Sequence, residues 1–432
     1  MKPSRLLVLT ALALCGCSVT SSLSSSSEAS SETSSEAKTS SEDSSVEPSS
    51  EPESSSSVLP QTPRIYASPL SETVTRLDTS FSNAGALALE QIAFGLEGDG
   101  NAVISPASYL LAIAGVNDVS ANMGVSFLGL NKGDAKKLLE AWNYHYERPS
   151  DNYDSAELSE MKSLLLHQQI GDAYRFDENK RQLLAEEYES TMVSSLDSYH
   201  EDAVDFFHND AGFTIEPPDP HATTDGIITY GAFKMKDCVA DDFGSSQRPF
   251  NGKDVECYSF GSTLWPEYWN YAKADHYCVF EFNVAFTSLM VILPDVGTEL
   301  EDISLSEAYR FYNENKKVTT VVGYVPYFHV ASQNVDLTSA LSSHLSGKEI
   351  FYDNLLEDTC VNNLSLSSIL QTSDFEFNKD GVSGESITAV YVCGSPEPTE
   401  HEVTYLNVDR PFYCLSLKDG FPLFANKITT LN

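Results

Sequence analysis

Two short stretches near the carboxyl end of the chain carry residue types that hydrolases use. The run from Gly381 to Glu385 comes close to the Gly-x-Ser-x-Gly turn that holds a nucleophilic serine, but it ends in Glu and no strand-turn-helix pattern surrounds it. His401-Glu402 lacks the second histidine that a zinc-binding helix needs. The 9 histidines are scattered, with none at ligand spacing. The sequence therefore predicts no enzyme, no metal site and no cofactor.

The polar segment that follows has the chemistry of a protease substrate instead. The run Asn378 to Thr388 and the run Asp409-Arg410-Pro411-Phe412 bracket it, and it contains Pro396 and Pro398. We expect an exposed loop that is fastened at both ends to β-structure. Such a loop predicts a protein that is cut by a protease and exploits the cut.

Several bonds of this loop remain candidates for cleavage. Ser395-Pro396 and Glu397-Pro398 are poor candidates, because most serine proteases do not cleave before proline. The candidate scissile region comprises Cys393, Gly394, Ser395, Thr399 and Glu400. None of its bonds follows Arg or Lys, so we expect a target that is not trypsin-like. Cys393 is either a reactive exposed thiol or a buried structural residue.

Alternation along the first part of the loop indicates that it can enter a buried sheet. Successive side chains of a strand point to opposite faces, so alternate residues must tolerate a core. Gly384 and Ser386 are poor residues for a permanent strand, which favours insertion over an ordinary edge strand of the same period. One face is uncharged and small or β-branched: Val382, Gly384, Ser386, Thr388, Val390 and Val392. The other face is Ser383, Glu385, Ile387, Ala389 and Tyr391.

Helical patterns concentrate in the first half of the chain and strand patterns in the second. Apolar spacing predicts helices over 77–96 and 109–116, and a composition rich in Glu, Leu, Lys and Gln predicts a helix over 177–196. Residues 164–169 are expected to form a strand. Short β-rich runs occupy 227–233, 277–283, 288–293, 319–324 and 375–378. This order predicts an α+β fold rather than alternating βαβ units.

The amino terminus has the pattern of an export signal. Lys2 and Arg5 precede the apolar run Leu6 to Leu14, which is shorter than the roughly 20 residues that span a bilayer as a helix. The ending Leu14-Cys15-Gly16-Cys17 resembles a bacterial lipobox, which implies cleavage before Cys17 and lipidation of its thiol; the alternative is an incidental cysteine behind a signal. Residues 18–66 are rich in Ser with scattered Glu, which predicts a disordered tether. Residues 67–432 are then one folded domain.

Composition restricts the partners. The chain has 432 residues and a formal charge of −37, which argues against nucleic acid and anionic membrane surfaces as partners. We expect a monomer whose contact with the membrane is the lipid anchor alone. Six cysteines follow the signal region and match no metal motif, and the sequence does not determine their pairing: Cys238, Cys257, Cys278, Cys360, Cys393 and Cys414.

From about residue 77 to the end, the chain resembles the serpin family. Gly381 and Thr388 match the family's proximal hinge, and Arg410-Pro411-Phe412 matches its distal anchor. The other matching runs are Asn101 with Ser105-Pro106 and Ser108 (the shutter), Ser288 to Pro294, Tyr324 to Phe328, Val335 to Leu337, and Phe424 to Ile428 (the closing strand). The resemblance implies a large mixed sheet, further sheets and an exposed reactive loop.

The resemblance also implies a function. A protease attacks the loop and forms an acyl-enzyme, and the freed hinge inserts as a new strand into an open row of the main sheet. With the amino-terminal pattern, this predicts a serine protease inhibitor on a bacterial cell membrane, facing the extracellular space. The alternative is a non-inhibitory, serpin-like surface protein that binds a ligand or a host protein.

Several positions depart from the family pattern and favour that alternative. The segment between Phe207 and Gly226 is too short for the helix that usually covers the main sheet. Asp237 lies near the place of an expected tryptophan, and Gln371 replaces an expected shutter histidine. Gly384-Glu385-Ser386 replaces an alanine-rich hinge, and the spacing from hinge to anchor is longer than usual.

Overall fold

The computed structural model describes residues 6–15, 79–148, 157–186, 189–238, 243–262, 264–345, 348–358, 364–383 and 403–431. Within these ranges, no helix is long and apolar enough to cross a membrane. The α-helices are α1 (Thr79–Ile92), α2 (Pro106–Val119), α3 (Asp134–Ala141), α4 (Glu178–Glu186), α5 (Tyr199–Asp205), α6 (Leu305–Asn315) and α7 (Ser339–Leu345). Shorter turns are the 3₁₀ segments η1 (Ala93–Leu96), η2 (Ser126–Leu128) and η4 (Leu300–Asp302) and the π segment η3 (Phe206–Asp210).

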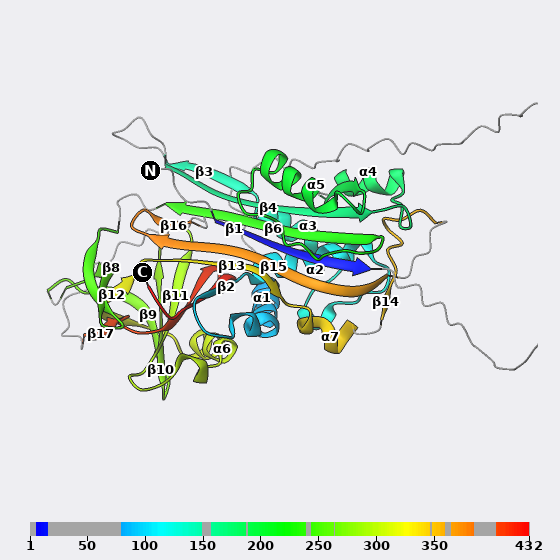
Figure 1. The fold of residues 1–432 in the computed structure, drawn as a ribbon. Coiled ribbons are helices and arrows are strands. Elements are labelled where there is room, and N and C mark those ends of the chain that lie inside the picture. Colours follow the sequence, from blue (N-terminus) through cyan, green and yellow to red (C-terminus); the bar gives the residue numbers. More distant parts are fainter. Residues whose placement is uncertain are drawn as a thin grey trace, which may run out of the picture.

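A nine-stranded main sheet dominates the structure (Figure 1). Its order is β1-β15-β16-β6-β4-β3, with β13 and β14 on β15 and β5 on β4. It is mixed because β4 and β5 are parallel whereas its other pairs are antiparallel. Its strands are β1 (Leu6–Cys15), β3 (Tyr144–Arg148), β4 (Glu157–Ile170), β5 (Glu189–Ser194), β6 (Gly226–Cys238), β13 (Phe328–Asp336), β14 (Glu349–Ile350), β15 (Leu364–Asn378) and β16 (Gly381–Ser383).

A ten-stranded second sheet has the order β2-β19-β18-β11-β10-β9-β12-β8-β7, with β17 beside β12. Strand β17 is parallel to β12 and follows the loop segment directly. The strands are β2 (Ala102–Ile104), β7 (Ser246–Phe250), β8 (Lys253–Phe260), β9 (Glu267–Lys273), β10 (Tyr277–Asn283), β11 (Ser288–Pro294), β12 (Lys317–Pro326), β17 (Thr404–Asn407), β18 (Phe412–Lys418) and β19 (Phe421–Ile428).

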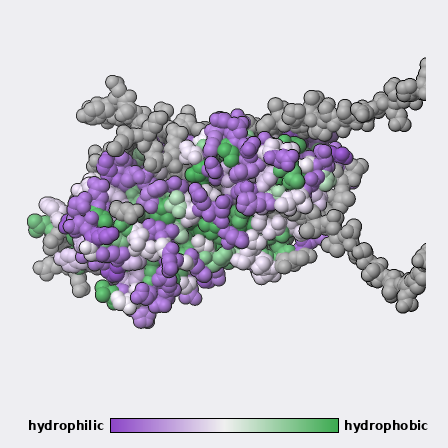
Figure 2. Space-filling model, viewed as in Figure 1, coloured by the Kyte–Doolittle hydropathy of each residue, from purple (hydrophilic) through white to green (hydrophobic). Residues whose placement is uncertain are grey.

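Strand β6 is buried on both faces and shows how the layers form. Phe233 and Met235 belong to the large core, where α2 lies between β6 and β19. Tyr230 and Ala232 point the other way, into a smaller cluster with Phe206 and Phe207. Period-two alternation thus supplies two cores from one strand. On the face in Figure 2, hydrophilic residues predominate and hydrophobic ones form small scattered groups.

The α+β fold with a large mixed sheet is confirmed, and most described helices lie in the first half of the chain. The predicted helix over 177–196 is wrong beyond Glu186, because residues 189–194 form β5 and pair with the buried strand β4. The segment between Phe207 and Gly226 was judged too short for the helix that covers the main sheet. The covering helix lies earlier, as α5 and η3, and its buried aromatic residues pack on β4 and β6.

Candidate functional site

Strands β6 and β15 flank a single row of the main sheet. Two strands fill this row in line: β16 at one end and β1 along the rest. Both are antiparallel to each flanking strand, so they run in the same direction. Figure 1 shows β1 in blue between β6 in green and β15 in orange. We call this position the insertion row.

The predicted hinge begins inside the insertion row. Asn378 pairs with Gly381 across a tight turn, and Val382 lies opposite Phe377 on one side and Asp237 on the other. Val382 is 1% exposed. Gly381 has φ +127°, and a Cβ there would lie 2.1 Å from the Asp237 carbonyl oxygen. Glycine is therefore required where the loop leaves β15.

Strand β1 fills the remainder of the row. Its residues pair with β6 without interruption from Leu6 opposite Met235 to Cys15 opposite Gly226. Its pairing with β15 carries one irregularity between Ala13 and Leu14. The expectation of an open row is therefore wrong for the chain with these residues, because the apolar run assigned to an export signal satisfies the hydrogen bonds of both flanking strands.

The predicted shutter residues meet at the start of α2. Ser105 caps the helix, with its Oγ accepting from the Ser108 amide at 3.2 Å and donating to the Leu423 carbonyl at 2.7 Å. The Ser108 hydroxyl donates to the Gly231 carbonyl of β6 at 2.8 Å. Pro106 occupies the first turn. The residues that the resemblance assigns to the shutter therefore cap α2 and also join it to β6 and β19.

Gln371 connects this point to the other flanking strand. Its Oε1 accepts from the Ser105 amide at 2.7 Å, and its Nε2 donates to the Ser105 carbonyl at 3.0 Å. Residue 10 of β1 pairs with both Gly231 and Gln371. The start of α2 is therefore hydrogen-bonded to both flanking strands, β6 and β15, beside residue 10 of β1.

Asp237 fastens the end of β6 to the turn between β10 and β11. Its Oδ2 accepts from the amides of Ala285, Phe286 and Thr287 at 3.2, 3.0 and 3.0 Å, and from the Thr287 hydroxyl at 2.9 Å. Complete burial raises the pKa of Asp237 to about 7, and these hydrogen bonds oppose the rise. The sequence showed this aspartate as a departure but gave no indication of its partners.

The distal anchor is fixed to the second sheet. Arg410 Nε donates to the Pro294 carbonyl at 2.8 Å, and its guanidinium pairs with Asp409. Pro411 leads into β18, where the buried Phe412 ring lies 5.9 Å from Phe328. Gly384, Ser386, Thr388, the candidate scissile residues and Cys17 lie outside the described residues.

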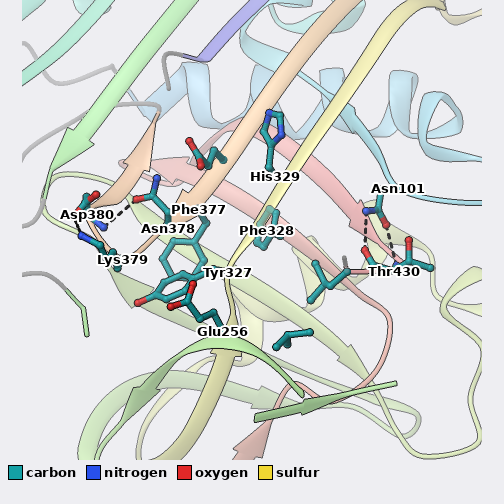
Figure 3. Close-up of a pocket in the computed structure, with 13 residues that line it drawn as sticks. Asn101, Glu256, Tyr327, Phe328, His329, Phe377, Asn378, Lys379, Asp380 and Thr430 are labelled. Carbon is teal, nitrogen blue, oxygen red and sulfur yellow. Dashed lines mark hydrogen bonds and ion pairs between the residues drawn. The ribbon is translucent and has the colours of Figure 1, made fainter. Parts of the chain in front are cut away.

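A polar surface pocket of about 530 Å³ lies at the base of the loop. In Figure 3, the turn Asn378 to Asp380 forms one side of it, and Asn101 with Thr430 forms the other. His329 lines it, and a hydrogen bond to Asp374 at 2.7 Å raises the pKa of His329. Ser383 is buried in β16, a geometry unlike the exposed serine of a nucleophile elbow.

Three of the described thiols are buried, and Cys238 at the end of β6 is partly exposed. Cys257, Cys278 and Cys414 form no disulfide, and burial raises the pKa of Cys257 to about 12 and of Cys278 to about 11. Such thiols are unreactive at neutral pH. The residues that the structure describes hold no group of metal-ligating side chains.

Comparison with known proteins agrees with this geometry. Residues 269–430 match the family model for serpins, described as serine protease inhibitors. No curated protein matches. The structure is similar to the thermophilic serpin tengpin in its native state (TM-score 0.58, 16% identity, 85% of this chain and 98% of that one). It is also similar to Serpin48 of the insect Tenebrio molitor (0.57, 16%, 83% and 100%) and to thyroxine-binding globulin in complex with thyroxine (0.57, 17%, 81% and 99%).

At 16–17% identity, the similar structures establish the fold of this chain alone. The chain has the serpin fold, and its carboxyl-terminal part, residues 269–430, matches the serpin family model.

Proposed function

We propose that this chain is a serine-type endopeptidase inhibitor that traps its target by cleavage of the reactive loop and insertion of the loop into the main sheet. The observation that supports this best is the position of β16. Its residues already pair with β15 and with β6, so the loop begins between the two strands that would receive the rest of it. In the protein cleaved before Cys17, insertion would only extend pairing that has started.

The driving force is the pairing of an exposed segment on two sides. At about 0.5–1.5 kcal/mol for each hydrogen bond, a strand the length of β1 would gain on the order of 10 kcal/mol, with burial of its inward face in addition. The inward face of the loop, from Val382 to Val392, holds no charge that would oppose entry.

The target in this proposal is an extracellular serine protease that is not trypsin-like, because no candidate bond follows Arg or Lys. We further propose that the protein is exported, lipidated at Cys17 and held by the tether of residues 18–66 at the outer side of a bacterial cell membrane. It acts there as a monomer. Its acidic charge would speed the approach of basic proteases.

The test uses protein exported from a bacterial host, with processing before Cys17 checked by mass spectrometry. It is mixed with elastase-like and chymotrypsin-like proteases and boiled in detergent. We expect a covalent adduct, and mass spectrometry of the released fragment gives the cleaved bond. Rapid, complete cleavage without an adduct for every protease would refute the inhibitor.

One observation favours the alternative of a non-inhibitory surface binding protein. In the chain that carries residues 6–15 the insertion row is filled, and a filled row takes no further strand. The hinge sequence Gly384-Glu385-Ser386 also favours this alternative. This alternative predicts a nicked protein that unfolds at the same temperature as the intact one, whereas insertion predicts a higher temperature after cleavage.

A further inference from the structure

The amino-terminal strand and the reactive loop share a sequence. Residues 10–16 read Thr-Ala-Leu-Ala-Leu-Cys-Gly, and residues 388–394 read Thr-Ala-Val-Tyr-Val-Cys-Gly. Four of these seven positions are identical, and two more are aliphatic in both segments. The two segments are thus related at one alignment, in which each residue of the first corresponds to the residue 378 positions later.

The backbone register leads to the same alignment independently. Val382 pairs with Asp237 of β6, so an extension of β16 along the row would set residue 384 opposite Met235. Met235 is the partner of Leu6. Continued to the shutter, the same count sets residue 388 opposite Gly231, which is the partner of Thr10. Pairing and sequence therefore give the same 378-residue offset.

The amino-terminal segment is also the better occupant of the row. Leu6 to Cys15 contains no charge, glycine or proline, whereas the corresponding loop residues include Gly384 and Glu385. Strand β1 pairs with both walls, and a central strand of a buried sheet forms its hydrogen bonds away from water. The row admits one strand at a time.

We propose that Leu6–Cys15 is a built-in mimic of the reactive loop, which occupies the loop's own row and blocks its insertion until the segment is removed. The shared row follows from the pairing alone, whereas the block on inhibition rests on the proposed function. A chain that keeps the segment is cut as a substrate. A chain cleaved before Cys17 has an open row and traps its protease. Removal of the segment thus activates the inhibitor after export.

The experiment uses the full chain, made without export and with Cys17→Ser so that no lipid is attached. The blocking segment is expelled by Ala11→Pro with Ala13→Pro, because proline cannot donate to the ladder of a central strand. The matched control is Ala29→Pro with Ala37→Pro in the tether. The probe is a fluorescent peptide of residues 6–15 with three added lysines, compared with a scrambled peptide that carries the same lysines.

We expect residues 6–15 of the unsubstituted chain to be protected from hydrogen exchange, as β6 and β15 are. The chain with prolines in β1 should take up the peptide and unfold at a higher temperature with it. Without the peptide, this chain should form several-fold more protease adduct than the control. The scrambled peptide should have no effect.

Two results would overturn the shared row: exchange of residues 6–15 as fast as that of the tether, or no more peptide uptake by the β1 variant than by the control. The first is read on the unsubstituted chain, so it holds even if the variant folds poorly. Peptide uptake without adduct for any protease would support the shared row and refute the proposed function. Equal adduct from the unsubstituted chain and the β1 variant would overturn the block.

Discussion

Gln371 of β15 holds the backbone of Ser105 by two hydrogen bonds, with its amide oxygen accepting from the Ser105 N–H and its amide nitrogen donating to the Ser105 carbonyl. Both residues are fully buried. Ser105 is also the residue whose hydroxyl caps α2, and Ser108 of that helix bonds to β6. One glutamine therefore ties a wall of the insertion row to the helix that supports the other wall.

Replacing this side chain should weaken the fold. Gln371→Ala leaves a buried N–H and a buried C=O of Ser105 without this partner, so we expect the free energy of unfolding to fall by about 1–3 kcal/mol. Urea unfolding measures it. The control, Gln333→Ala at an exposed position, should change the value by no more than about 0.5 kcal/mol. A loss no larger than that of the control would show that the bidentate contact does not support α2.

Gly381→Ala tests the close approach at the base of the loop. We expect a loss of at least about 1–3 kcal/mol, because φ is +127° and the new Cβ would meet the Asp237 carbonyl. Gly297→Ala is the matched control, with φ +91° and no atom within 4 Å of the added Cβ, so it carries the backbone strain alone. Equal losses in thermal unfolding would mean that the contact with β6 adds nothing.

Asp237 should make stability depend on pH. Its pKa is about 7 in the folded protein against 3.8 for an ordinary aspartate, so between these values the unfolded chain loses a proton that the folded chain keeps. Its contribution is fully present at low pH and is lost as pH rises through 7. Asp237→Asn should flatten the fall in unfolding free energy between pH 5 and pH 8, as measured by urea titration at each unit.

Two further observations help to interpret the pH profile of Asp237→Asn. Asp254→Asn, at an exposed position, should leave the pH profile unchanged. Part of the slope should survive in Asp237→Asn, because burial also raises the pKa of Asp118 to about 7. A profile for Asp237→Asn that is identical to that of the unsubstituted chain would contradict the assignment.

Thr388→Arg tests the inward face of the loop in the processed protein. The register of β6 sets residue 388 opposite Gly231, beside the start of α2, where an unpaired charge is costly. We expect cleavage at an unchanged rate, with at least about a tenfold loss of detergent-stable adduct. Glu385→Arg, on the opposite face at a position that already carries a charge, should keep most of the adduct. Loss from both variants alike would argue against the predicted alternation.

Much of the framework was predictable because its patterns are local. Apolar spacing placed the first helix, and the strand predicted over 277–283 is β10. Period-two alternation marked the loop as a segment able to form a strand. The prediction that the helix continues to residue 196 was wrong. Composition favours a helix there, but residues 189–194 pair with β4 and form a strand. The helix propensity of a short segment is weaker than the hydrogen bonds and packing that the segment gains by pairing with a buried sheet.

The site was predictable in part. Ser105, Ser108, Gly381 and Arg410 were named from the sequence, whereas Asp237 and Gln371 were seen only as substitutions. Their roles depend on partners far along the chain, such as Ser105, which lies 266 residues from Gln371. A signal for the occupant of the row was present in the repeat of residues 10–16 at 388–394, but the repeat acquires meaning only once both segments can be assigned to one row.

The sequence by itself predicted which segments form strands and which loop side chains suit a buried face, because period, size and charge are properties of neighbouring residues. The tertiary structure alone decided which strand lies between β6 and β15. Two segments of this chain suit that row, and the choice between them depends on hydrogen bonds to walls that exist only after the sheet has formed.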